Sequence, residues 1–407
     1  MQNGQDKYFL HADGDSFFVA CELVARPDLR GKPVVVGEDR GIAVAMSKEA
    51  KKLGVTRGMP VYQIKREFPS VVILPHNFEL YKEISQEMYD ILLSFVDKIE
   101  RYSIDECFAI VTQPDIKYAG DEKKFVQEIK NEIETKLGVT YSFGLAHTKT
   151  LAKTASKLEK PNGLTLLLTK DDEISALKNT QIEDVWGIGR RTFPRLIERG
   201  IKTAYDFINM QESEIEKFFS EPLLVLKKEL GGEQIMTVES DYDERDQKSL
   251  QSTATFKPSS SDAKVIWAEL ADNVEEACAR ARELKLQTNS VSFFVKNIEF
   301  VSRGDSVKLS LYTADPGVIL NAIEESFSEI LKKGEQIRST GISLLNLVRT
   351  ENVQQDLFGK QNNLNAKLAV ENMADKVRMK YGHSAVRRAS ALRAKPKNRG
   401  NSLPGSV

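Results

Sequence analysis

The chain is poor in the residues that build disulfide frameworks, zinc sites and membrane spans. It has three cysteines, Cys21, Cys107 and Cys278, which are far apart and lack zinc-ligand spacing, so we expect small buried residues. No run approaches the roughly 18 apolar residues of a membrane helix, and the N-terminal residues lack the basic flank and apolar stretch of a signal peptide. We therefore expect a cytoplasmic protein without a membrane segment.

The chain also lacks a net charge of either sign. Its formal net charge is −1, which gives no indication of nucleic-acid binding, so the distribution of charge matters more than the sum. Residues 360–399 hold eleven Lys or Arg against two acids, a surplus of nine, which leaves −10 for residues 1–359. Residues 185–202 hold five basic residues and one acid. Such a run is either a solvated helix face or a local nucleic-acid contact.

The length of 407 residues leaves room for roughly two to four domains, and 41% apolar with 29% charged residues is typical of globular proteins. Residues 1–168 alternate strand-like and helix-like segments, which predicts an α/β unit. We find no internal repeat. The expected strands are 8–13, 34–38, 41–46, 99–104, 108–111, 139–146 and 163–168, and the expected helices are 47–54, 78–97, 123–137 and 148–158.

The second half of the chain changes character twice. Residues 170–232 are predicted to be wholly helical with turns at Gly187, Gly200 and Gly231, and the polar, acidic stretch 239–249 is predicted to be an exposed linker. A second α/β unit then extends to about residue 350. Its βαββαβ order predicts a four-stranded antiparallel sheet with two helices on one face. Beyond this unit we expect a polar, loosely tethered tail. The expected strands are near 250–257, 290–301, 306–313 and 339–348, and the expected helices are 262–284 and 316–333.

Three acidic residues in or just after apolar strands are the most informative feature of the sequence. Asp13 lies in FLHADGDSFF, and the adjacent Asp105 and Glu106 lie in YSIDECF. Burying unpaired carboxylates is costly, and two of them about 4 Å apart repel by roughly 4 kcal/mol at an effective dielectric near 20. Such a cluster requires cations. Oxygen ligands without His or Cys favour Mg²⁺, which predicts two-metal phosphoryl or nucleotidyl transfer.

This hypothesis makes a geometric demand on the acidic pair. Asp13 and Asp15 would share a face of a continuing strand, whereas the adjacent Asp105 and Glu106 would point in opposite directions. Both can reach one site only if the chain bends there or forms a hairpin end. Alternatively, an adjacent acidic pair simply marks a turn.

Four segments, which follow one another along the chain in the family's order, resemble the Y-family translesion DNA polymerases. YSIDECF resembles their catalytic motif, and ADGDSFFVACE (12–22) resembles their first metal-binding segment. SFGLAHTKTLAKTASKLEKPNG (142–163) is similar to the segment that closes their palm domain, and VWGIGRRT (185–192) to the hairpin of their thumb. The resemblance extends over about residues 7–350.

The resemblance implies roles for the acidic residues and their neighbours. Asp13, Asp105 and Glu106 match the three catalytic, metal-binding carboxylates, and the carbonyl of Gly14 matches a further ligand. Asp15 matches a position that is acidic in relatives but is not a ligand. Two Mg²⁺ ions would activate the primer 3′-hydroxyl and hold the triphosphate.

The nucleotide-binding residues also follow from the resemblance. Phe18 matches the steric gate that leaves no room for a ribose 2′-hydroxyl. Most Phe residues on a helix are core residues, but the register of the motif favours the gate. Lys160, in KPNG, matches a phosphate-binding lysine. The amides of Phe17 and Phe18 at a helix start can donate to the same anion.

The chain departs from the polymerase IV pattern at two lysines. Lys48 stands where relatives have Tyr, and Lys51 where they have Arg, so charge is kept at 51 but bidentate geometry is lost. TKTLAK (148–153) is more similar to the catalytic subunit of polymerase V, so both branches remain open. Ile42 and Val44 would lie over the templating base pair, or they are core residues of a strand.

A hairpin and a short peptide are expected to contact macromolecules. Gly187, Ile188 and Gly189 would form a hairpin whose amides hold a primer phosphate, with Arg190 and Arg191 adding charge. Pro194 must then fall in the first turn of the following helix. QQDLF (354–358) resembles the peptide by which bacterial polymerases bind the sliding clamp, with contacts from Gln354, Leu357 and Phe358.

Together these observations predict a template-directed DNA polymerase of the translesion type. It would bind primer–template DNA, deoxynucleoside triphosphates and the sliding clamp, act as a monomer without a membrane, and have low fidelity because no segment remains for a proofreading exonuclease. The alternatives are a catalytically inactive DNA-binding scaffold and a palm-type nucleotide cyclase. The expected layout is palm (1–17 and 79–168), fingers (18–78), helical thumb (169–238), linker (239–247), little finger (248–350) and a flexible basic tail (351–407).

Overall fold

The computed structural model describes residues 7–38, 41–117, 119–239, 247–353, 360–382 and 385–392. The chain divides into two compact units, and the division falls between residues 243 and 244, inside the stretch expected to be a linker. In the described part of the chain no helix is long and apolar enough to cross a membrane. The three cysteines are free and buried, as expected.

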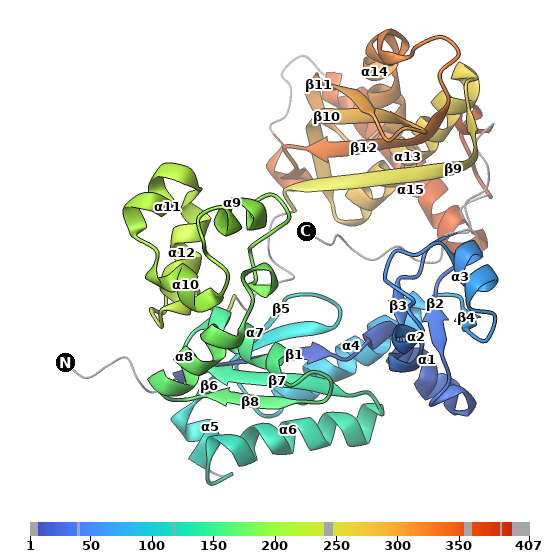
Figure 1. Ribbon diagram of the computed structural model, residues 1–407. Helices are drawn as coiled ribbons and strands as arrows, with labels where there is room; N and C mark the ends of the chain where they lie inside the picture. Colours follow the sequence, from blue (N-terminus) through green and yellow to red (C-terminus); the bar gives the residue numbers. More distant parts are fainter. Residues whose placement is uncertain are drawn as a thin grey trace. The chain divides into compact units, whose positions relative to one another are not determined.

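A five-stranded sheet forms the centre of the first unit (Figure 1). Its strand order is β5-β6-β1-β7-β8, with β1 antiparallel to both neighbours and β7 parallel to β8. The central position of β1 explains its apolar sequence, because both of its faces are covered. The strands are β1 (Lys7–Gly14), β5 (Ile99–Arg101), β6 (Glu106–Thr112), β7 (Tyr141–Ala146) and β8 (Leu164–Leu167).

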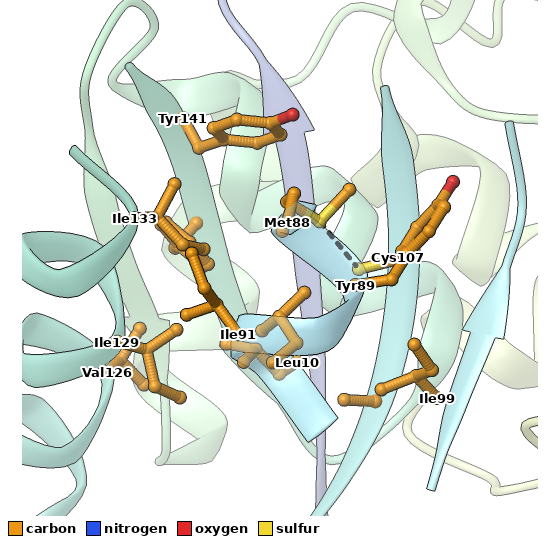
Figure 2. Packing of buried hydrophobic residues seen from close by; sticks show 14 of the residues in the cluster. Leu10, Met88, Tyr89, Ile91, Ile99, Cys107, Val126, Ile129, Ile133 and Tyr141 are labelled. Carbon is orange, nitrogen blue, oxygen red and sulfur yellow. Dashed lines mark hydrogen bonds between the residues drawn. The ribbon is translucent and has the colours of Figure 1, made fainter. Parts of the chain in front are cut away.

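Different helices cover the two faces of this sheet. On one face, α4 (Phe78–Leu93) and α6 (Glu122–Leu137) bury their apolar stripes against Leu10, Cys107 and Tyr141, as Figure 2 shows. On the other face, α7 (Lys149–Leu158) packs against β7, β1 and β8 and shares an apolar core with Phe9 and Phe108. Helix α4 ends four residues before the expected 97, and the short α5 (Gln113–Lys117) follows β6.

The alternation of side chains along β1 determines on which face of the sheet the acidic residues lie. Leu10 and Ala12 belong to the core under α4 and α6, whereas Phe9 belongs to the core under α7. Because side chains alternate along a strand, Asp13 lies on the same face as Phe9, the face toward α7. Glu106 pairs directly with Asp13 and alternates in the same way with Cys107.

A small three-stranded sheet of order β3-β2-β4 follows β1. The expected hairpin is confirmed as an antiparallel pair, but its connection is longer, since β2 ends at Val36 and β3 begins at Ala45. A third strand, parallel to β2, was not predicted. The elements are α1 (Phe17–Ala25), η1 (Pro27–Leu29), β2 (Val34–Val36), β3 (Ala45–Met46), α2 (Lys48–Lys52), α3 (Val61–Glu67) and β4 (Val72–Leu74).

Short helices make up residues 170–230, as predicted, and they share one apolar core with α7. Gly187 and Gly200 adopt positive φ, and at the last turn the left-handed residue is Gly232 rather than Gly231. Pro194 lies in the first turn of α9, where it removes no helical hydrogen bond. The helices are α8 (Lys170–Asn179), η2 (Ile182–Asp184), α9 (Phe193–Ile197), α10 (Ala204–Asn209), α11 (Glu212–Phe218) and α12 (Glu221–Leu230).

The second unit contains the expected four-stranded antiparallel sheet, in the order β11-β10-β12-β9. Helices α13 and α14 pack against this sheet and against each other (Figure 1). The hairpin between β10 and β11 turns at Phe300, which has a positive φ. The elements are β9 (Ser249–Ser260), α13 (Ala263–Glu283), β10 (Leu286–Asn297), β11 (Ser302–Thr313), α14 (Pro316–Ile330), β12 (Ile337–Leu345), β13 (Val348–Arg349) and η3 (Thr350–Asn352).

The prediction of a loosely tethered tail is wrong for two segments beyond residue 359. Helix α15 (Lys360–Tyr381) and the turn η4 (Ala389–Ala391) pack on α13. Arg282 of α13 forms a bidentate ion pair with Asp375, at 2.6 and 2.9 Å. Arg378 approaches Glu275 at 3.4 Å, and the amide of Arg388 donates to the same carboxylate at 3.1 Å. Arg378 and Arg388 therefore neutralise Glu275 of α13, and Arg282 of α13 in turn neutralises Asp375 of α15.

Replacing Arg378 by Met is expected to lower the free energy of unfolding of the second unit by about 3 kcal/mol, because it removes the closer of the two guanidinium groups that neutralise the buried carboxylate of Glu275. Arg378 is 8% exposed and Glu275 is 7% exposed. Burial raises the pKa of Glu275, and the arginines oppose that shift. Chemical denaturation followed by circular dichroism measures the loss. The matched control is Lys380→Met, which removes an exposed charge from the same helix; equal losses would contradict the assignment.

Candidate active site

The three acidic residues meet where β1 ends. Asp13 lies directly opposite Glu106 on the neighbouring strand, and the amide of Gly14 donates to the carbonyl of Asp105 at 2.9 Å. The amides of Tyr102 and Ser103 both donate to the carbonyl of Glu106, which closes a tight turn between β5 and β6. The acidic pair therefore lies at a hairpin end, which is the geometry that the sequence demanded.

Each carboxylate has its own partner in this structure. Asp13 forms an ion pair with Lys160 at 2.5 Å, and Glu106 accepts from the ammonium of Lys153 at 2.8 Å. Asp105 accepts from the hydroxyl of Ser103 at 2.7 Å. Within the described ranges, no three His, Cys, Asp or Glu side chains converge closely enough to form a ready-made metal site. The carboxylates are neighbours, but they are turned toward separate partners.

The electrostatics of the cluster show that its negative charge is only partly compensated. Burial raises the pKa of Asp13 to about 6, with Lys160 lowering it and the carboxylates of Glu106 and Asp105 raising it. Burial likewise raises the pKa of Asp105, and Glu106 adds to the effect. A divalent cation would offset both the loss of hydration and the repulsion between the carboxylates, because it supplies positive charge to hard oxygen donors. By donor chemistry and charge, the residues fit such an ion.

Asp15 has a different task from its neighbour Asp13. It accepts from the hydroxyl of Ser142 at 2.8 Å and from the amide of Asn162 at 2.7 Å. These bonds fasten the loop that carries Lys160 to the end of the sheet. With its oxygens occupied in this way, Asp15 acts as a structural anchor.

Phe17 and Phe18 open helix α1 immediately after β1, and they have different environments. Phe17 is buried in the core. Phe18 is half-buried and stacks on Tyr81, with ring centroids 4.6 Å apart and an interplanar angle of 16°. The edge of Phe78 supports it from another side, at 6.0 Å. The ring is therefore held in place while part of it stays accessible.

The lysines of α2 lie at different distances from this helix start. Lys51 donates from its ammonium to the hydroxyl of Ser16 at 3.2 Å, which brings a cation to the first turn of α1. Lys48 is exposed, and within the described part of the chain it forms no hydrogen bond or ion pair with that turn. Of the two candidates over a base pair, Ile42 is 50% exposed, whereas Val44 packs against a core of Val19 and its neighbours. Lys51 and Lys48 therefore differ in their contact with the start of α1, and Ile42 and Val44 differ in their exposure to solvent.

The predicted hairpin follows η2. Gly187 has a φ of 89°, which favours glycine, and Ile188 is buried in the helical core. The side chains of Arg190 and Arg191 are exposed. Among the described residues, the amides of Gly187 and of Gly189 to Arg191 have no protein acceptor. The amide of Ile188 donates to the carbonyl of Val185 at 3.1 Å, so the expectation that it is free to hold a phosphate is wrong. The hairpin is anchored by its isoleucine and presents free donors beside two cations.

Sequence reasoning missed the lysines that face the sheet from α7. Lys153 pairs with Glu106, and one turn earlier Lys149 pairs with Glu100 at 2.7 Å. Both ammonium groups are buried, with side chains 6% and 7% exposed. The i, i+4 spacing on a helix that follows a buried strand was the only indication in the sequence. The proposed clamp-binding residues Gln354, Leu357 and Phe358 lie outside the described residues.

Two family models match this chain. The model of the impB/mucB/samB family matches residues 12–157, and the model of that family's C-terminal domain matches residues 247–357. Among curated proteins, the chain is 29% identical over 362 residues to a DNA polymerase IV of Ureaplasma parvum serovar 3, covering 88% of this chain and 99% of the relative. It is 32% identical over 369 residues to Protein UmuC of Salmonella typhimurium, covering 86% and 85%.

Solved structures give the same picture. A Y-family DNA polymerase chimera of Dbh and Dpo4 superposes with a TM-score of 0.71 and 25% identity, covering 84% of this chain and 99% of the other. An insertion ternary complex of Dbh DNA polymerase superposes with a TM-score of 0.55 and 25% identity over the same shares. The similarity to these structures therefore extends over most of the chain.

Proposed function

The chain belongs to the impB/mucB/samB family and is a Y-family translesion DNA polymerase, and from that premise we propose how its residues carry out nucleotidyl transfer. The observation that carries the proposal is the placement of Asp13 opposite Glu106, with Asp105 at the adjoining hairpin end. Neither alternative is favoured: an inactive scaffold has no need of this buried acidic cluster, and a cyclase has no need of a primer-binding hairpin.

Asp13, Asp105, Glu106 and the carbonyl of Gly14 would hold two Mg²⁺ ions. When bound, the ions would lower the pKa of the primer 3′-hydroxyl and stabilise the attacking and leaving oxygens. Divalent metal dependence follows from the family, and the identity and number of the ions are our proposal. Lys160 would bind the triphosphate, since its ammonium already lies at the carboxylate of Asp13.

The helix start at Phe17 and Phe18 would bind the rest of the nucleotide. Their amides and Lys51 would contact phosphate oxygens, and Lys48 would add exposed positive charge nearby. Lysine gives single contacts where the fork of an arginine would give two. The ring of Phe18, fixed by its stack on Tyr81, would fill the space needed by a 2′-hydroxyl. Of the two base-pair candidates we retain Ile42 as a direct contact, with Val44 supporting it.

The hairpin from Gly187 to Gly189 would hold the primer strand through its phosphates. Free amides at Gly189, Arg190 and Arg191 can donate to phosphate oxygens, and the two arginine side chains add charge. Contacts of this kind ignore base identity, as a polymerase requires. They also predict binding that weakens as salt concentration rises.

We further propose that the family's layout applies to this chain. The palm would comprise 1–17 and 79–168, the fingers 18–78, the thumb 169–238 and the little finger 248–350, with 239–247 as a linker. The flexible basic tail expected over 351–407 is not retained for α15 and η4, because both pack on α13 in the second unit. Synthesis would be distributive, of low fidelity, and carried out by a monomer in the cytoplasm.

The peptide QQDLF (354–358) would bind the sliding clamp, with Leu357 and Phe358 in an apolar pocket and Gln354 beside it. Deleting it is expected to abolish clamp binding and to leave extension by the free enzyme unchanged, because the proposed catalytic residues lie in the other unit. Surface plasmon resonance on immobilised clamp measures the first effect, and primer extension without clamp measures the second. A variant with the same residues in scrambled order is the control. A complex that persists after the deletion would refute this assignment.

Primer extension by the purified protein with Mg²⁺ distinguishes the proposed function from its rivals. A polymerase incorporates the nucleotide that the template specifies. A scaffold binds the primer–template without extending it, and a cyclase converts nucleoside triphosphate to a cyclic product without DNA.

A further inference from the structure

Lys153 lies in a cage built from two parts of the first unit. Its ammonium is 4.2 Å from the ring centroid of Tyr102, 5.2 Å from that of Trp186 and 5.8 Å from that of Phe108. The fourth contact is the ion pair with Glu106, at 2.8 Å. A cation over aromatic faces is attracted by the negative face of each ring, more strongly when water is excluded. The cage therefore has the chemistry of a site built for one positive charge.

The walls of this cage are fastened to one another. The indole of Trp186 donates to the hydroxyl of Tyr102 at 3.0 Å, and their rings meet edge to face at 5.6 Å. Tyr102 belongs to the turn that ends at the acidic pair, and Trp186 directly precedes Gly187 of the hairpin. The cage thus joins the segment that presents the primer-binding amides to the segment that presents the carboxylates.

We propose that Lys153 is a positioning residue of the metal site, a resident cation that holds Glu106 and competes with the divalent ion for it. This inference rests on the proposed function, because it takes Glu106 to be a metal ligand. When the metal binds, the carboxylate turns away from the ammonium, which stays in the aromatic cage. The metal-free enzyme is thereby protected from an uncompensated acidic cluster.

If Lys153 competes with the metal for Glu106, its removal should increase the affinity for the metal. This direction distinguishes competition from a role in packing alone. Removing the ammonium frees the carboxylate and removes a like charge from the neighbourhood of the metal, so both consequences strengthen metal binding. A lysine that merely supports the fold would, when replaced, weaken metal binding or leave it unchanged.

Lys149 supplies a matched control. It lies one turn earlier on α7, its side chain is buried to the same degree, and it also pairs with a buried glutamate, Glu100. It also approaches the ring of Phe108, at 4.7 Å. Its carboxylate partner is not among the proposed metal ligands, so Lys149→Met reproduces the loss of a buried ion pair without freeing Glu106.

Titration with Mn²⁺, followed by the electron paramagnetic resonance of the free ion and without DNA or nucleotide, tests the proposal. Lys153→Met is expected to lower the half-saturating concentration by at least about five-fold, as the loss of a nearby like charge implies. Lys153→Arg keeps the charge and is expected to stay near wild type, as is Lys149→Met. Thermal denaturation checks that all variants are folded.

The fluorescence of Trp186 gives a second readout of the cage. The chain has two tryptophans, so Trp267→Phe leaves Trp186 as the reporter. Mg²⁺ is expected to change its emission in that background, because the ammonium relaxes among the rings when Glu106 leaves. The added Lys153→Met substitution is expected to remove the change.

Two outcomes separate this inference from the function on which it rests. If Mn²⁺ binds to wild type and not to the variant with Ala at Asp105 and Glu106, while Lys153→Met binds as wild type or more weakly, the competition is refuted and the metal site stands. If the variant with the two alanines binds Mn²⁺ as wild type does, the metal site itself is wrong.

Discussion

Replacing Asp105 and Glu106 together by Ala is expected to reduce templated nucleotide incorporation by at least about a thousand-fold, because each group that stabilises developing charge in a transition state contributes roughly a hundred-fold or more. Both side chains are proposed metal ligands at one hairpin end. Primer–template binding should persist, since the proposed DNA contacts lie in the hairpin that starts at Gly187 and in the two arginines that follow it. Single-turnover extension of a labelled primer measures the rate, and fluorescence anisotropy measures the binding.

The matched control replaces two acids whose loss should be harmless. Glu87 and Asp90 are exposed on α4 in the same unit, so their replacement by Ala removes the same charge from a solvated helix face. Extension by that control is expected to equal wild type. If the variant at Asp105 and Glu106 extends a primer as well as the control does, the enzyme assignment of these carboxylates fails.

Phe18→Ala is expected to lower the discrimination between deoxyribonucleotides and ribonucleotides by about a hundred-fold. The ring is held by Tyr81 and Phe78, so it does not move aside for a hydroxyl, and its loss opens the space that the 2′-hydroxyl needs. An apolar pocket rejects an added hydroxyl by roughly a hundred-fold at most, which sets the scale. The ratio of kcat/KM for a deoxynucleotide and its ribonucleotide is the measurement.

Phe78→Leu controls for a general disturbance of this aromatic group. It removes the edge contact to Phe18 but leaves the proposed gate in place, so sugar discrimination is expected to stay within about three-fold of wild type. Phe18→Leu should fall between alanine and wild type, because it retains part of the volume. Sugar discrimination that is unchanged in Phe18→Ala would remove the gate assignment.

Alternation of strands and helices was sufficient to predict the central sheet of the first unit and the four-stranded sheet of the second. The apolar run of β1, the helical periodicity of α4 and the βαββαβ order of the second unit each specify an element and its face locally. Strand β4 (Val72–Leu74) was missed, because three residues carry too little periodicity to distinguish a strand from a loop. Its pairing partner, β2, is more than thirty residues away in sequence, so only the tertiary fold reveals the pair.

The roles of charged residues were harder to predict from the sequence than those of apolar residues. The sequence shows a charge but not its partner, so the basic residues after 359 had the same appearance whether they meet DNA, solvent or α13. In the structure Arg378 meets Glu275, and Lys153 meets Glu106. The acidic trio was easier, because an acid in an apolar strand is costly wherever its partner lies.

Lys48 and Lys51 show that two residues of the same type on one helix can have different contacts. Both carry the same charge, yet only Lys51 reaches the first turn of α1, through Ser16. We therefore expect Lys51 to contribute more to triphosphate binding than Lys48. The two lysines, which we expect to stand in place of two residues of the polymerase IV pattern, are therefore not equivalent.

A crystal structure of the ternary complex with primer, template, incoming nucleotide and Mn²⁺ tests the central claim most directly, because anomalous scattering locates the metal. The account predicts two anomalous peaks bound by Asp13, Asp105 and Glu106, with Lys160 turned from Asp13 to the triphosphate. Peaks held by other residues, or carboxylates still paired with Lys160 and Lys153 while a nucleotide is bound, would contradict it.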